Sequence, residues 1–388
     1  MPIINRMAEL HDEIAAWRQH LHANPELMYD VHETAAMVAQ KLREFGCDEV
    51  VEGIGRTGVV GVIAGNRGAG STIGLRADMD ALPIMEETGK PHASKNPGKM
   101  HACGHDGHTA MLLGAARYLS ETRNFSGRAV VIFQPAEEGG AGGRAMVEDG
   151  MMDRFAIDEV YGLHNMPGLP VGEFAIRPGP IMAATDEFDI TISGVGAHAA
   201  MPHQSVDPIT IAAQCIMAMQ TIVSRGVDPV ESLVVSVTQV HSGFTDNVIP
   251  TTAMLNGTVR SLKPELRVFA EERIRQIVKG IVEAHGASAN IDFVHNYPVT
   301  HNHEEQTQKA IAVAESVVGE GKVEKNVRPT LGGEDFSYML EARPGAFIFM
   351  GNGDTASLHN PAYDFNDDAI PVGSSYWAKL VETLLPAR

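Results

Sequence analysis

The densest group of metal-binding side-chain types lies in the segment Met100-His101-Ala102-Cys103-Gly104-His105-Asp106-Gly107-His108. Cys103 and His105, two residues apart, can bind one metal ion from a loop, because glycine lets the backbone fold tightly around it. Histidines beside a helix N-terminus are often capping or surface residues. Four ligand-type side chains this close together favour a metal site instead.

A pair of carboxylates follows the apolar run Ala129–Phe133. Glu137 and Glu138 stand just beyond the end of this predicted strand, where adjacent carboxylates repel each other unless a cation lies nearby. One of them can bind a metal while its neighbour takes a proton from bound water. Taken alone, the motif also fits a solvated acidic turn. The glycines at 139–143 are not followed by Gly-Lys-Ser/Thr, so no nucleotide-binding loop is predicted.

Three further motifs place polar side chains after apolar runs or in polar loops. Asp78 and Asp80 end the strand that starts at Thr72 and lie on the same side of an extended segment. A carboxylate there can orient a ligand histidine or bind metal directly. His164 follows an apolar strand, and His359 lies in a polar loop near the C-terminus. Together these residues supply the histidines that a two-metal hydrolytic site needs.

Two catalytic alternatives to a metal site depend on a nucleophilic side chain. No serine stands in a Gly-x-Ser-x-Gly elbow, which weakens a serine hydrolase interpretation. Cys103 beside several histidines could form a thiolate pair. That alternative gives no reason for Glu137 and Glu138, whereas a dinuclear site uses the thiolate as a ligand and one carboxylate as a base. A metal-free binding protein on the same scaffold is the alternative of another class.

Strands and helices alternate along most of the chain. This rhythm predicts an α/β fold with a mostly parallel sheet flanked by helices, in which sites gather at the C-terminal ends of the strands. Gly46 is a natural end for one of the helices. The expected strands are 59–64, 72–75, 129–133 and 160–163, and the expected helices are 33–45, 109–119 and 374–384.

The pattern changes around Thr185 to the order β-α-β-β-α-β. This order predicts an inserted ferredoxin-like α+β domain of about a hundred residues. The expected domains are therefore a discontinuous catalytic domain, 1–185 and 297–388, and an inserted domain, 186–296. Within the insert we expect strands 189–193, 233–240, 253–260 and 289–294 and helices 208–224 and 264–283.

Composition excludes several classes of protein. The chain has 388 residues, of which 44% are hydrophobic and 20% charged, and it has no apolar run of about 20 residues, so no membrane span is expected. A net charge of -19 disfavours nucleic acid as a partner. Cys47, Cys103 and Cys215 are an odd number of cysteines, and the N-terminus lacks a signal-peptide pattern. We therefore expect a cytoplasmic protein.

Taken together, the motifs resemble the aminoacylase and carboxypeptidase-like dinuclear metallohydrolases, in particular the branch of hippurate hydrolases and plant auxin-conjugate hydrolases. The resemblance implies that Glu137 is the base that activates water and that Asp80 is the aspartate beside the metal site. It also implies five metal ligands, Cys103, His105, Glu138, His164 and His359. The motifs that carry it lie at 21–27, 76–83, 101–108, 134–139, 162–165, 196–202, 332–336 and 358–360.

The chain departs from many of these relatives at two places. They have His-x-Asp where this chain reads Asp78-Met79-Asp80, and an aspartate bridge where it has Cys103. The branch named above shares both changes. The resemblance implies two divalent ions per subunit. A thiolate ligand favours zinc, whereas a set of histidines and carboxylates also suits manganese, so we expect zinc or manganese, with cobalt or nickel as alternatives.

The resemblance also implies that the inserted domain forms a homodimer, or a tetramer, and lends residues to the site. His198, Asn247 and Arg260 would then contact the substrate. A histidine can donate to a developing oxyanion, and an arginine can grip an α-carboxylate with two hydrogen bonds. Arg260 can equally be an ordinary strand residue.

The implied function is metal-dependent hydrolysis of N-acyl amino acids, hippurate-like or indoleacetyl conjugates, to a carboxylic acid and a free amino acid. A deacetylase of N-acetyl amino acids, or a dipeptidase or carboxypeptidase, is the alternative within the family. The acyl group is left open, because apolar residues without a pattern line such pockets.

Overall fold

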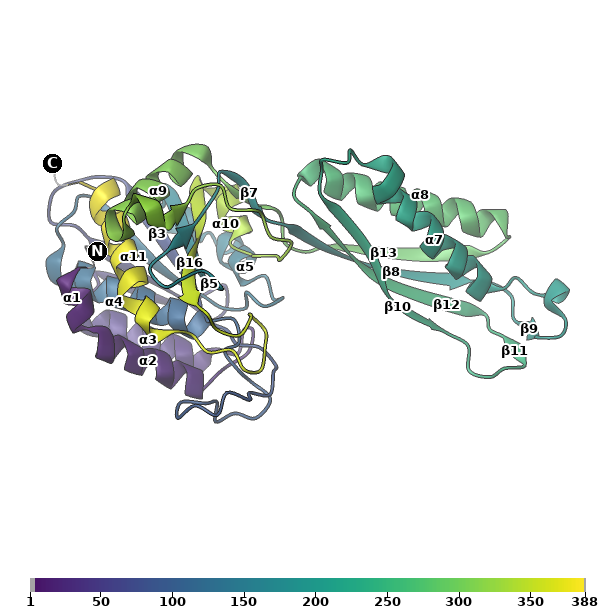
Figure 1. Ribbon diagram of the computed structural model, residues 1–388, viewed down its shortest axis with the longest axis horizontal. Helices are drawn as coiled ribbons and strands as arrows, with labels where there is room; N and C mark the ends of the chain where they lie inside the picture. The colour runs from purple at the N-terminus through teal and green to yellow at the C-terminus, as the bar shows by residue number, and fades with distance from the viewer. Residues whose placement is uncertain (1–3, 387–388) are drawn as a thin grey trace. The chain divides into compact units, whose positions relative to one another are not determined.

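The structure is a computed structural model that describes residues 4–386, and these form two compact units (Figure 1). The larger unit contains the described residues up to Ile181, then His301–Arg328 and those from Asp335 onward. The smaller unit contains Met182–Thr300 and Pro329–Glu334. We expected an inserted domain over 186–296. The short segment Pro329–Glu334 carries no sequence signal that links it to the smaller unit.

The larger unit is built on an eight-stranded sheet. Its central strands β4, β3, β5 and β16 are parallel, whereas β1, β2 and β6 join by antiparallel pairing. The predicted α/β class with a mostly parallel sheet is confirmed. In sheet order the strands are β1 (Glu49–Ile54), β2 (Gly58–Ala64), β4 (Arg128–Gln134), β3 (Thr72–Asp78), β5 (Glu159–Pro167), β16 (Gly345–Gly353), β6 (Phe174–Ala175) and β15 (Val323–Glu324).

Helices flank this sheet (Figure 1). Helix α4 packs against α2, α11 and β3, and a separate group joins α5 to α6, α10 and β4. The helices are α1 (Asn5–Glu9), α2 (His11–Ala23), α3 (His32–Glu44), α4 (His105–Thr122), α5 (Gly142–Glu148), α6 (Met151–Arg154), α9 (Glu304–Val318), α10 (Ser337–Ala342) and α11 (Ile370–Leu384), with short 3-10 helices η2 (Glu320–Lys322) and η3 (Asp367–Ala369). Two short strands, β7 (Gly179–Met182) and β14 (Thr300–Asn302), pair with each other.

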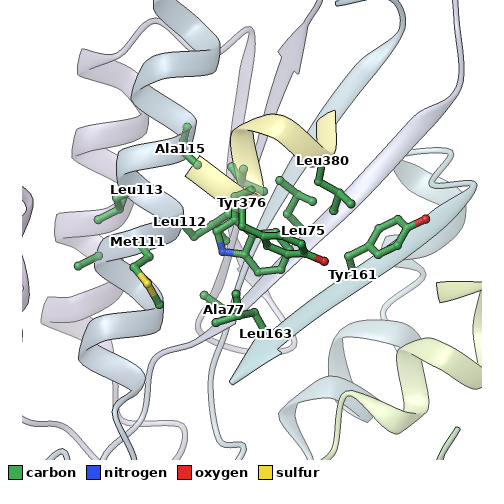
Figure 2. Close-up of a cluster of buried hydrophobic side chains, with 14 of the residues drawn as sticks. Leu75, Ala77, Met111, Leu112, Leu113, Ala115, Tyr161, Leu163, Tyr376 and Leu380 are labelled. Atoms are coloured by element: carbon green, nitrogen blue, oxygen red, sulfur yellow. The ribbon is translucent and has the colours of Figure 1, made fainter. Parts of the chain in front are cut away.

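The main core of the larger unit lies between α4, α11 and the strands β3 and β5 (Figure 2). Leu75 and Ala77 of β3 and Leu163 of β5 face Leu112 of α4 and Leu380 of α11, and all are buried. Strands covered on both faces read as continuous apolar runs, which is why short sequences such as Ala129–Phe133 predict them. Each fully buried leucine contributes about 1.5 to 3 kcal/mol to folding.

Helix α4 begins four residues earlier than the sequence predicts, at His105 rather than Thr109. Gly104 precedes it in the left-handed region, with φ 91°, which suits glycine. The prediction was wrong because Gly107 lowers the helix propensity of this segment. The packing of α4 nevertheless requires a glycine at this position. A Cβ at Gly107 would lie 2.3 Å from the ring of Phe365. His105 and His108 therefore stand on the first turn of the helix.

The smaller unit is a four-stranded antiparallel sheet with α7 and α8 packed against it (Figure 1). Its chain order is β8-α7-β10-β12-α8-β13, which confirms the predicted ferredoxin-like insert. The alternate burial along β8 shows one face covered by the helices. The elements are β8 (Ala184–Ser193), β9 (Ala197–His198), η1 (Pro202–Gln204), α7 (Pro208–Gly226), β10 (Leu233–Ser242), β11 (Val248–Ile249), β12 (Thr252–Ser261), α8 (Pro264–Ala284) and β13 (Ser288–His295).

Within residues 4–386, no helix combines the length and the apolar character needed to cross a bilayer.

Candidate metal centre

All five predicted metal ligands come together at the C-terminal ends of the parallel strands. Strand β4 leads to Glu138, β5 carries His164, the loop after β16 carries His359, and Cys103 and His105 stand at the start of α4. Their ligand atoms, with those of Glu137, form three groups in which every atom lies within 4.8 Å of the others. The groups are Cys103, His105 and His164; Cys103, Glu138 and His359; and His105, Glu137 and Glu138.

The contacts within the cluster join atoms that commonly bind metals. Cys103 Sγ lies 3.4 Å from His164 Nε2. Glu138 Oε1 lies 3.3 Å from His359 Nε2 and 3.9 Å from His105 Nε2. Cys103, His105 and His164 are buried, while His359 is half exposed. Sulfur, imidazole nitrogen and carboxylate oxygen together match the donor set of zinc and related divalent ions.

The tautomers of the two buried histidines are set by backbone carbonyls. His105 Nδ1 donates to the carbonyl of Asp80 at 2.8 Å, and His164 Nδ1 donates to that of Asn165 at 2.7 Å. Each Nε2 atom then keeps its lone pair for the centre of the cluster. Within residues 4–386, His105 Nε2 and Glu138 Oε1 are buried without a hydrogen-bond partner. Because buried polar atoms are rarely left unpaired, these residues fit a bound cation.

The electrostatics of the cluster point the same way. Burial lowers the pKa of His105, but the carboxylates of Asp78, Asp80 and Glu138 outweigh it and raise the pKa to about 10. A field that draws a proton to His105 also favours a divalent cation.

The same surroundings argue against Cys103 as a nucleophile. Burial, followed by the charges of Glu138 and Glu137, raises the pKa of the Cys103 thiol well above its ordinary value. A nucleophilic cysteine needs a lowered pKa, whereas a thiolate bound to a cation is stabilised by that cation.

Asp80 holds the segment that carries the two glutamates. Its buried carboxylate accepts hydrogen bonds from the backbone N–H of Glu137 at 2.9 Å and of Glu138 at 3.1 Å. Its carbonyl accepts the bond from His105. Asp80 therefore links the start of α4 to the turn after β4, as expected of a residue that orients metal ligands.

The remaining polar residues of the densest motif serve other contacts. His108 Nδ1 donates to Asp78 at 2.7 Å, and His108 Nε2 accepts from the backbone N–H of Asn165 at 3.0 Å. Arg76 donates to the other oxygen of Asp78 at 2.7 Å. His101 is buried, and neither ring nitrogen has a partner within the described chain. Burial lowers the pKa of His101 to about 3. His108 thus supports the segments that carry His105 and His164, whereas His101 makes no hydrogen bond within the described chain.

In the smaller unit, His198 and Asn247 are brought together. Both line a surface cavity of 590 Å³. Strands β9 and β11 pair there, with His198 opposite Val248. Ala199 N donates to the carbonyl of Asn247 at 3.0 Å.

Arg260 lies elsewhere in the smaller unit, near the far end of β12. Eight residues at 3.3 Å each put it roughly 26 Å along the strand from Thr252. Its guanidinium donates to the hydroxyl of Thr258 and to the carbonyl of Val259, the latter at 3.0 Å, and makes no ion pair within residues 4–386. The three residues expected at the substrate therefore do not form one cluster in a single chain.

Sequence reasoning gave no role to several residues that support the site. Asn165 and Tyr363 contact the Cys103 loop, and His22 binds Asp106 next to His105. Their positions near the motifs could have indicated them. Asn165 and His22 lie inside the motifs at 162–165 and 21–27. Tyr363 closely follows the motif at 358–360.

The sequence model of Peptidase family M20/M25/M40 matches residues 74–383. That range includes every residue of the cluster.

Individual relatives are similar over nearly the whole chain. A hippurate hydrolase of Campylobacter jejuni is 45% identical over 381 residues, covering 98% of each chain. An N-acetyl-L-cysteine deacetylase of Bacillus subtilis is 41% identical, covering 98% of this chain and 90% of its own. Among solved structures, the Bacillus subtilis YXEP protein, a dinuclear metal-binding peptidase, superposes with a TM-score of 0.85 at 35% identity, covering 98% of this chain and 100% of its own.

Proposed function

The chain belongs to Peptidase family M20/M25/M40, and from this premise we propose that it is a metal-dependent amidohydrolase of N-acyl amino acids. It would release a carboxylic acid and a free amino acid. The observation that carries the proposal is the buried cluster of ligand-type atoms in which His105 Nε2 and Glu138 Oε1 have no hydrogen-bond partner among the described residues. The names of the relatives support the substrate class, because hippurate and N-acetyl-L-cysteine are both N-acyl amino acids.

Cys103, His105, Glu138, His164 and His359 would hold two divalent ions, zinc or manganese, with cobalt or nickel as alternatives. The dinuclear site of the YXEP relative supports the number. When bound, the ions polarise the substrate carbonyl and make water acidic enough to lose a proton near neutral pH.

Glu137 would move that proton. Its side chain is almost fully buried, and its backbone is held by Asp80 beside the ligand Glu138. A carboxylate oxygen of Glu137 takes the proton from the attacking water and returns it to the amide nitrogen as the bond to carbon breaks. The leaving group is then a neutral amine rather than an amide anion.

Substrate recognition would draw on the smaller unit. Arg260 carries a guanidinium without an ion pair in the described chain, and it suits a free α-carboxylate. His198 would donate to the developing oxyanion, and Asn247 would bind the substrate beside it. Because these residues lie far apart in one chain, we infer that two copies of the chain contribute to each site, in a homodimer or a tetramer.

The experiment begins with removal of metal by a chelator, followed by reconstitution with zinc, manganese or cobalt. Hippurate and N-acetyl-L-cysteine are then compared with their carboxamides and with short peptides. We expect turnover to vanish on chelation, to return with metal, and to favour substrates with a free carboxylate.

Full activity in metal-free protein would overturn the proposal. Reconstituted protein that binds these compounds without turnover would indicate a binding protein, and faster release of C-terminal residues from peptides would indicate a carboxypeptidase.

A further inference from the structure

The side chain of Asn165 joins three segments that carry the proposed metal ligands. Its Nδ2 donates to the carbonyl of Cys103 at 2.6 Å. Its Oδ1 accepts from the hydroxyl of Tyr363 at 2.8 Å. Asn165 directly follows His164 in β5, and Tyr363 lies in the loop that carries His359. Asn165 and Tyr363 are fully buried, so water does not compete for these bonds.

The first turn of α4 is tied to the same amide. His108 Nε2 accepts from the backbone N–H of Asn165 at 3.0 Å and lies 3.1 Å from Asn165 Nδ2. One hydrogen of the Asn165 amide therefore goes to the Cys103 carbonyl, the other shares the lone pair of His108 Nε2 with the backbone N–H, and the amide oxygen has a donor. This complete set of partners fixes which end of the amide faces Cys103.

Gly104 shows that the Cys103 loop is seated tightly on this pair. A Cβ at Gly104 would lie 2.2 Å from Asn165 Nδ2 and 2.5 Å from the Tyr363 hydroxyl oxygen. Only glycine leaves room for that approach, and only glycine takes its φ of 91° without strain. The loop between Cys103 and His105 is thus shaped against Asn165 and Tyr363.

We propose that Asn165 and Tyr363 form a clasp, defined by these two side chains, which positions Cys103 and thereby sets the metal affinity of the site. The inference rests on the proposed function, because it assigns Cys103 to metal binding. Both are positioning residues that touch the ligand loop and neither metal nor substrate. Partners of this kind commonly change metal affinity by about 10- to 100-fold when they are removed.

The first test is Tyr363→Phe, which removes the hydroxyl and keeps the ring. Zinc affinity is measured by competition with a chromophoric chelator, and the absorption of the cobalt-substituted protein reports on the bond between thiolate and metal. We expect affinity to fall about 10- to 100-fold and the thiolate-to-cobalt charge-transfer band to shift.

Tyr376→Phe is the matched control. Tyr376 is also fully buried, in α11, and its hydroxyl has no hydrogen-bond partner in the described chain (Figure 2). Removing that hydroxyl should leave both zinc affinity and the cobalt spectrum at their wild-type values.

A second variant, Asn165→Asp, keeps the acceptor for Tyr363 and loses the donor to Cys103. We expect it to weaken zinc binding at least as much as Tyr363→Phe. The double variant should bind zinc no more weakly than Asn165→Asp alone, because the hydrogen bond from Tyr363 and the hydrogen bond to Cys103 both depend on the Asn165 amide. Should Tyr363→Phe fail to fold, this variant decides.

The outcomes separate the clasp from the proposed function. Wild-type protein that binds no metal would overturn the function and the clasp with it. Wild-type binding together with unchanged affinity and spectrum in Tyr363→Phe would overturn the clasp alone. A variant that only melts at lower temperature, with an unchanged cobalt band, would also overturn it, since its role is then structural.

Discussion

Glu137 and Glu138 are neighbours in sequence, but their side chains have different surroundings. Glu138 Oε1 lies within 4 Å of two ligand histidines, at 3.3 Å from His359 and 3.9 Å from His105. Glu137 joins only one of the groups that contain a ligand histidine. This difference supports the proposed roles, metal binding for Glu138 and proton transfer for Glu137.

The variants Glu137→Gln and Glu138→Gln should therefore differ in metal content and in turnover. Glu137→Gln should keep its metal, and its turnover number should fall about 100- to 10,000-fold, which is the usual contribution of a general base. Glu138→Gln should lose metal. Elemental analysis of both variants, beside their turnover numbers, is the measurement. Metal loss confined to the Glu137 variant would mean that the roles are reversed.

The ligand types could be predicted from sequence because each motif is local. Cys103 and His105 lie two positions apart, and Glu137 and Glu138 follow one apolar strand. The clasp could not be predicted, because Tyr363 and Asn165 are 198 positions apart and neither is a ligand type. Only the fold brings such partners together.

At the scale of elements, helices α2 and α4 are joined by buried charges. His22 of α2 donates from Nδ1 to Asp106 of α4 at 2.8 Å, and neither side chain is exposed. Burial lowers the pKa of His22, but the hydrogen bond to Asp106 and its charge outweigh this and raise the pKa to about 9. Arg18, also in α2, lies 3.5 Å from the same carboxylate. The pair thus holds the first turn of α4 against α2.

This pair should make stability depend on pH in a defined direction. The pKa of His22 is higher in the folded state than its ordinary value of 6.5. Its contribution is therefore fully present below about pH 6.5 and is lost as the pH rises through about 9. We expect His22→Asn to lower the free energy of unfolding by on the order of 1 to 3 kcal/mol near pH 6, and by much less near pH 10.

Urea unfolding at the two pH values measures the effect, with His20→Asn as the control, since His20 is exposed on the same helix. A loss of stability in His22→Asn that is equal at both pH values would show that the pair does not titrate as described.

Elements were predicted where their pattern is local. Buried parallel strands read as apolar runs, and the β-α-β-β-α-β order of the insert follows from alternation and helical spacing. The start of α4 was missed because packing against Phe365 outweighs the low helix propensity around Gly107. The position of β16 in the sheet could not be predicted, since its partner strand β5 lies in a distant part of the sequence.

For the whole molecule, the separation of Arg260 from His198 and Asn247 bears on assembly. Arg260 lies roughly 26 Å along β12 from Thr252, the end of the strand that follows Asn247 and β11, so Arg260 and Asn247 do not contact one small substrate together. Two copies of the chain can supply Arg260, His198 and Asn247 to one site if the cavity that His198 lines in one copy faces the substrate bound by the other.

Mixing two inactive variants tests this arrangement. His198→Ala lacks the donor, Glu137→Gln lacks the base, and a mixed dimer restores one complete site of its two. We expect about a quarter of wild-type activity in a randomly exchanged mixture and about a half in purified mixed dimers. His198→Ala alone should keep its metal and its oligomeric state. Mixed dimers without any activity would show that His198 does not act across subunits.

The position of β16 also fixes the order in which the chain can be completed during translation. The strand lies between β5 and β6, so it fills the interior of the sheet rather than an edge. When the ribosome has made both neighbours and the contiguous insert Met182–Thr300, that interior position is still open. The insert can therefore fold before the larger unit, whose sheet is complete only after β16 has been synthesised. His359 follows β16 and is the last of the five proposed ligands to be synthesised, so on the proposed function full metal loading would be a late event in biosynthesis.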